Sequence, residues 1–186
     1  MKRLFFCSLF TLSILSLTTA QRFFSKDAHV NFSATANASP EKIEASNTKA
    51  VCVIDDNTGA IEVAVLVKSF HFERALMEEH FNENYLESHK FPKATFVGII
   101  TDIKNVNIKK DGNYTVNVTG KLTLHGVTKD VNTTAVISVA NGALSNAKTA
   151  FSVKLSDYGI DIPGAVKDKV ASDAKIDLNT ALSVYK

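Results

Sequence analysis

The chain has 186 residues with 21 basic and 19 acidic side chains, so its formal net charge is only +2. The surplus comes from Lys2 and Arg3, and beyond residue 20 the formal charges cancel. No basic surface is left to attract nucleic acid, and the length favours one domain with a substantial core.

The N-terminal stretch is typical of a secretory signal peptide. Lys2 and Arg3 precede an apolar run over residues 4–17, and small residues follow up to Ala20. Signal peptides share this order of regions, and the run is too short to span a membrane. We therefore expect residues 1–20 to be cleaved off, leaving a domain over residues 21–186 with no membrane span. The expected location is periplasmic or secreted.

Beyond the leader, apolar and polar side chains alternate along most of the chain. In the segment 61–67, Ile61, Val63 and Val65 share one face. Such alternation predicts half-buried antiparallel strands. Turn-forming pairs such as Asn141-Gly142 separate the runs, and about eight strands at this spacing predict an all-β sandwich or closed barrel.

The alternation stops between residues 74 and 86. There Leu76, Met77, Phe81 and Leu86 approximate the spacing of a short amphipathic helix, with the surrounding acidic residues as its solvated face. Pro92 then disfavours a helical conformation at the preceding residue, so a strand follows. We expect a short helical insert near residues 74–86. A second interruption, between residues 157 and 175, is predicted to contain one helical turn.

No motif of catalysis or metal binding was found. The sequence has no glycine-rich phosphate loop, no Gly-x-Ser-x-Gly elbow and no paired cysteines. His71, His80 and His89 are nine residues apart, and nine helical residues turn through roughly 900°, which puts successive histidines on opposite faces. His125 has no identifiable nucleophile or acid partner. We predict no enzyme activity, no cofactor and no metal.

The one cysteine beyond the leader is Cys52, which excludes an internal disulfide. It lies in a strand-like run without a neighbouring charge that would clearly lower its pKa. A small buried hydrophobic side chain is therefore favoured over a reactive thiol.

Phenylalanine is the abundant aromatic residue, with twelve in the chain and no tryptophan. An ordinary core would account for this abundance. The functional alternative is an aromatic wall inside a barrel, with the helical insert closing one mouth. The phenylalanines that cluster around the insert are Phe70, Phe72, Phe81, Phe91 and Phe96.

Three stretches carry a resemblance to one known family. Residues 77–98, MEEHFNENYLESHKFPKATFVG, resemble its short helical run followed by an aromatic-Pro pair and a strand. Residues 120–131, GKLTLHGVTKDV, resemble its Gly-x-Leu-Thr-x-x-Gly-Val-Thr-Lys strand pair. Residues 151–160, FSVKLSDYGI, resemble its late strand ending in Asp-aromatic-Gly-Ile. In this order they resemble the YceI-like family of secreted, lipocalin-like polyisoprenoid-binding proteins, over essentially all of the chain beyond the leader.

The resemblance implies an extended eight-stranded antiparallel barrel that holds a long lipid without catalysis. The implied partner is a polyisoprenoid, an isoprenoid quinone or another amphiphile. Residues 162–175, IPGAVKDKVASDAK, depart from the acidic turn of many members, which bears on ligand identity. The alternative is a closed barrel acting as a structural or interaction module, and the sequence does not decide whether a homodimer forms. The expected ligand-binding residues are Phe32, Phe70, Phe72, Met77, Phe81, Phe96, Leu122, Leu124 and Phe151.

Overall fold

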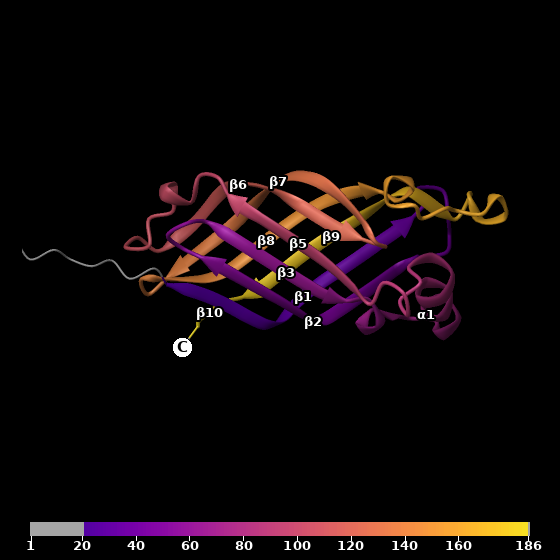
Figure 1. Cartoon of the computed structure of the whole chain (residues 1–186), viewed down its shortest axis with the longest axis horizontal. Coiled ribbons are helices and arrows are strands. Elements are labelled where there is room, and N and C mark those ends of the chain that lie inside the picture. The colour runs from indigo at the N-terminus through magenta and orange to yellow at the C-terminus, as the bar shows by residue number, and fades with distance from the viewer. Residues whose placement is uncertain (1–20, 186) are drawn as a thin grey trace, which may run out of the picture.

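The structure, a computed structural model, describes residues 21–185, so the expected signal peptide lies outside the described residues. One antiparallel sheet curves round and closes on itself as an extended barrel (Figure 1). The strands are β1 (Arg22–Thr35), β2 (Glu44–Asp55), β3 (Ala60–Leu66), β4 (His71–Phe72), β5 (Lys93–Ile100), β6 (Gly112–Leu124), β7 (Val127–Ala140), β8 (Ala143–Lys154), β9 (Val170–Ala181) and β10 (Ser183–Val184).

Eight long strands form the closed ring, in the order β1-β9-β8-β7-β6-β5-β3-β2 and back to β1. The two-residue strands β4 and β10 pair with β2 and β1. This arrangement confirms the predicted all-β class and the eight-stranded antiparallel barrel.

The expected helical insert is present between β3 and β5, at one end of the barrel (Figure 1). It consists of α1 and a π-helical turn that follows without a break, which confirms the prediction for residues 74–86. The helical turn predicted between residues 157 and 175 is the short 3-10 helix η5. The helical elements are η1 (Val67–Ser69), α1 (Ala75–His80), η2 (Phe81–Tyr85), η3 (Ile103–Asn105), η4 (Leu155–Tyr158) and η5 (Gly164–Val166).

The two ends of the barrel differ in how they are filled. Near the end that carries the β2–β3, β5–β6 and β7–β8 turns, Phe23, Ile54 and Ile100 are each at most 1% exposed. Ile103 and Val106, in and after η3, are buried there as well. This end is a packed core, whereas the outer cavity described below lies at the end with the insert.

Two paired glycines make room for an aromatic ring on the inner face. Gly98 of β5 lies directly opposite Gly120 of β6. A Cβ atom at Gly120 would lie 2.6 Å from the Phe96 ring and 2.6 Å from the Cα of Gly98. The absent side chains therefore give the Phe96 ring its position, in the way that aromatic rings cover glycines in other sheets.

We expect Gly120→Ala to lower the free energy of unfolding by roughly 1–3 kcal/mol, because the added methyl group overpacks the wall. Urea denaturation measures the change. Gly164→Ala is the matched control, since a Cβ there meets no atom within 4 Å. Equal stability of the two variants would contradict this account of the glycine pair.

Candidate ligand-binding lumen

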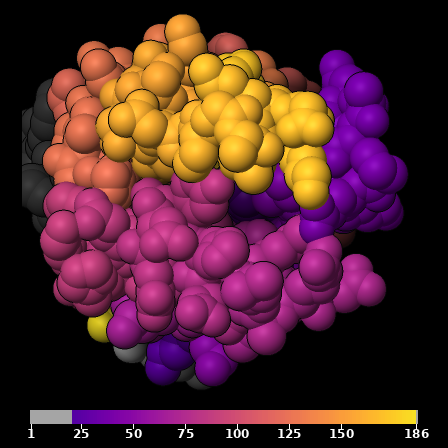
Figure 2. All heavy atoms as spheres, turned by 90° about the vertical axis from the view of Figure 1, so that its right-hand side faces the viewer, coloured from indigo at the N-terminus to yellow at the C-terminus, as the bar shows by residue number. Residues whose placement is uncertain are grey.

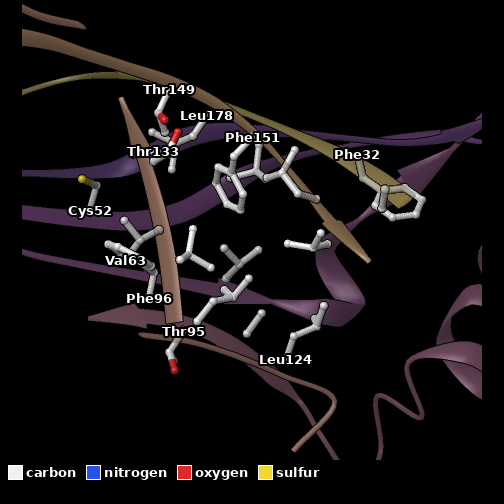
Figure 3. A pocket seen from close by; sticks show the side chains of 18 of the residues that line it. Phe32, Cys52, Val63, Thr95, Phe96, Leu124, Thr133, Thr149, Phe151 and Leu178 are labelled. Atoms are coloured by element: carbon white, nitrogen blue, oxygen red, sulfur yellow. The ribbon is translucent and has the colours of Figure 1, made fainter. Parts of the chain in front are cut away.

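A long cavity, the lumen, runs inside the barrel from Cys52 at one end to Phe32 at the other (Figure 3). Its cavity volume is about 140 Å³, and the gaps between side chains together with the adjoining solvent bring the whole region to about 1260 Å³. Among the described residues that line it, the polar side chains are Thr95, Thr133, Thr149 and Lys148. An interior so poor in hydrogen-bonding groups suits an apolar chain better than a polar molecule.

The structure brings seven of the nine expected ligand-binding residues to the lumen. The other two, Phe72 and Met77, do not line it. They lie around a second, outer cavity at the mouth, because the insert places them beyond the end of the inner wall. Ligand contact by any of the nine remains a prediction. The seven in the lumen wall are Phe32, Phe70, Phe81, Phe96, Leu122, Leu124 and Phe151.

Four phenylalanine rings separate the two cavities. Phe81, at the end of α1, lies 5.4 Å from Phe32, 5.6 Å from Phe70 and 5.0 Å from Phe72 between ring centroids. The rings are tilted or edge-to-face, the arrangements that aromatic pairs prefer. Phe32 and Phe81 line both cavities. We call these four residues the aromatic gate, since their rings pack together where the two cavities meet.

The insert is fastened to the barrel by a polar contact that sequence reasoning missed. The Nε2 atom of His125, in the β6–β7 turn, lies 3.1 Å from a carboxylate oxygen of Glu87. Its Nδ1 atom lies 3.1 Å from the backbone oxygen of Tyr158. The centroid of its ring lies 4.7 Å from that of the Phe91 ring. Both ring nitrogens face acceptors, so the protonated imidazole satisfies both. Three separate segments are thereby joined at the mouth.

The charge state of this contact depends on pH in a defined direction. The Lys90 ammonium and then the His125 ring lower the pKa of Glu87 from its ordinary value. A carboxylate with a lowered pKa stabilises the fold above its ordinary pKa, and the contribution is lost as the pH falls through the lowered value. The contact is therefore weakened when the pH is low enough to protonate the Glu87 carboxylate.

Cys52 closes the inner end of the lumen and is 0% exposed. Burial raises the pKa of its thiol to about 12. The thiol is therefore protonated at neutral pH, which agrees with a small hydrophobic side chain and not with a reactive nucleophile.

We expect Cys52 to react with iodoacetamide at pH 8 more than roughly a hundredfold slower in the native protein than in urea. The unfolded thiol has an ordinary pKa near 8.5 and is exposed, whereas the native one is neither ionised nor accessible. Mass spectrometry follows the labelling. The control is Leu66→Cys in a Cys52→Ala background, because position 66 is 45% exposed. Rapid labelling of Cys52 in the native protein would show that its thiol is not a buried, unreactive side chain.

Residues 21–185 show neither a metal-binding cluster nor a membrane-spanning helix. His71, His80 and His89 are all exposed, and no group of three or more His, Cys, Asp or Glu side chains within this range is arranged to hold a metal ion. Within the same range, every helix is too short or too polar to span a membrane.

Comparison with known proteins identifies relatives in sequence and in fold. A profile of the YceI-like domain matches residues 13–182. A UPF0312 protein of Pseudomonas fluorescens is 33% identical over 128 residues, 64% of this chain and 62% of the relative. One from Pseudomonas putida is 29% identical over 123 residues, 63% of this chain. The match spans only 60% of the length of that relative.

Two solved structures share the fold. A polyisoprenoid-binding domain from Saccharophagus degradans, implicated in plant cell wall breakdown, superposes with a TM-score of 0.73. It is 11% identical and covers 90% of this chain and 100% of its own. BcnA of Burkholderia cenocepacia superposes with a TM-score of 0.65, at 20% identity over 84% of this chain and 96% of its own. At these identities the likeness concerns the fold alone.

Proposed function

This chain belongs to the YceI-like family, and from that premise we propose that it binds a long apolar lipid, of polyisoprenoid or isoprenoid-quinone type, in order to carry or store it without catalysis. The observation that carries the proposal is the apolar lumen inside the barrel, which shares lining residues with the outer cavity beside the insert. The fold shared with a polyisoprenoid-binding domain supports this class of ligand.

The physical reason for such a protein is the low solubility of the ligand. Each CH₂ group transferred from water to an apolar interior gains about 0.8 kcal/mol, so a long chain needs shielding along its whole length. The lumen wall offers that shielding, with the bulky side chains of Phe96, Leu122 and Phe151 on the inner face. A closed-barrel module would need no internal cavity, so the apolar lumen supports the lipid-binding proposal over that alternative.

The proposal is tested by native mass spectrometry of the purified protein, followed by extraction into organic solvent and analysis of the extract. We expect one lipid per chain, released on denaturation and identified as an isoprenoid by its fragment spacing. If the protein is ligand-free and takes up no added prenyl lipid or quinone, the closed-barrel module becomes the better description.

The proposed location is the periplasm or the exterior of the cell, on the basis of the leader-like residues 1–20. We expect the mature chain to begin at Gln21. Fractionation of the source cells shows the compartment, and mass analysis of the N-terminal peptide shows the first residue of the mature chain. Recovery of a soluble product that still starts at Met1 would overturn the proposed location and leave the lipid proposal untouched.

A further inference from the structure

The outer cavity differs from the lumen in its chemistry. Its cavity volume is about 270 Å³, and the gaps between side chains together with the adjoining solvent bring the whole region to about 1000 Å³. Figure 2 looks at this end of the barrel and shows a recess between the insert, in magenta, and the segment around residue 165, in yellow. Apolar side chains form the floor, with Phe32 and Phe81 shared with the lumen. The polar lining residues are Glu41, Arg74, His80, Tyr85 and Lys169.

Three of these side chains form a charged trio across the opening. Glu41 accepts a hydrogen bond from Nη1 of Arg74 through one carboxylate oxygen. The other oxygen lies 3.2 Å from Nζ of Lys169. The three residues come from the β1–β2 loop, the start of the insert and the segment before β9. With two cations and one anion, the trio carries a net charge of +1.

The trio has more donors than it uses. A guanidinium offers five N–H donors and an ammonium three, and neither group can accept a hydrogen bond. In the structure Glu41 is the one acid that lines this cavity. Arg74 and Lys169 are each about half exposed to the opening, so donors remain free for a ligand. The matching ligand group is anionic and bears several acceptor oxygens.

We propose that the outer cavity is a subsite for the anionic head of the lipid, a phosphate or carboxylate held by Arg74 and Lys169, while the chain passes the aromatic gate into the lumen. The inference rests on the proposed function and narrows the ligand class. An amphiphile of this kind places its apolar part among the lumen side chains and its charge beside the trio. A neutral quinone head gains much less from the two cations.

The test compares three ligands with one chain and different heads: geranylgeraniol, geranylgeranoic acid and geranylgeranyl diphosphate. Calorimetric titration of the full mature protein gives the affinity of each. We expect both anionic ligands to bind more tightly than the alcohol, and their advantage to shrink as salt is raised. The carboxylate and diphosphate arms show which head the subsite prefers.

Substitutions then assign the effect to the trio. Arg74→Gln and Lys169→Gln should each weaken binding of the preferred anionic ligand by roughly three- to tenfold, because each removes one partly exposed charge-assisted contact. Binding of geranylgeraniol should not change. Glu41→Gln should strengthen anion binding, because the competing carboxylate is gone. The control is Lys109→Gln, which makes the same charge change beyond η3, at the opposite end of the barrel.

Each other outcome counts against the subsite. If the alcohol and the anions bind alike, or Arg74→Gln, Lys169→Gln and Lys109→Gln act alike, the head does not occupy the outer cavity, and the lumen proposal stands. If Glu41→Gln weakens all three ligands equally, the trio only holds the mouth together. If the wild-type protein binds none of the three, the proposed function and the subsite fail together.

Discussion

Replacing Phe81 by alanine is expected to lower the free energy of unfolding by roughly 3–5 kcal/mol, the usual effect of truncating a buried phenylalanine. Phe81 is 6% exposed and contacts the rings of Phe32, Phe70 and Phe72. Because Phe81 lines both cavities, its truncation enlarges the space between them. Urea denaturation of the ligand-free protein gives the change directly.

The matched control for this substitution is Phe24→Ala. Phe24 is only half-buried, and its one ring partner is Tyr185 at 5.4 Å. We expect Phe24→Ala to lower the free energy of unfolding much less, because truncation near the surface leaves no enclosed cavity. A Phe81→Ala protein as stable as the Phe24→Ala protein would show that the aromatic gate is not a packed unit.

The Phe81→Ala variant should also join the two cavities into one. If the gate limits ligand exchange, the variant releases bound lipid faster than the wild type at a temperature where both are folded. Stopped-flow transfer of a fluorescent prenyl lipid to vesicles measures this rate. Unchanged release would mean that the ligand does not pass between Phe32 and Phe81.

Narrowing the lumen is expected to exclude long prenyl chains before short ones. Ala94 lines the lumen and pairs with Val65 across the sheet, so Ala94→Leu puts three more carbon atoms into the cavity. We expect an affinity loss that grows with chain length, from little for a C₁₀ chain to more than roughly tenfold for a C₂₀ chain, at about 0.8 kcal/mol per CH₂ displaced. Titration with a prenyl alcohol series is the measurement.

The same substitution on the outer face serves as the control. Ala64 is adjacent to Val65 in β3 and therefore points to the opposite side of the wall. Ala64→Leu should leave the whole chain-length series unchanged. Gly120→Val is unsuitable for narrowing the lumen, because a Cβ there already collides with Gly98 and the Phe96 ring. If folded Ala94→Leu binds all lengths as the wild type does, the lumen does not hold the chain.

Much of the fold could be predicted from local pattern. A period of two along the chain predicts half-buried strands whatever their partners are, and the break in that period located the insert around Met77 and Phe81. Of the seven expected ligand-binding residues that line the lumen, five lie in strands, where alternation already groups the apolar side chains on one face. The other two, Phe70 and Phe81, lie outside the strands. Phe72 and Met77 were harder to place, because the direction of a helical insert depends on what it packs against.

The sequence by itself determined the all-β class, the alternation of apolar and polar side chains along the strands and the position of the insert, because these follow from residues close in the chain. The tertiary structure alone decided what meets at the mouth. Glu41 and Arg74 are 33 positions apart in the sequence, and Glu87 and His125 are 38 apart. No local pattern marks such pairs, since they form only when the strands close into a barrel, with β1 paired to the distant β9, and loops from different hairpins come to the same end.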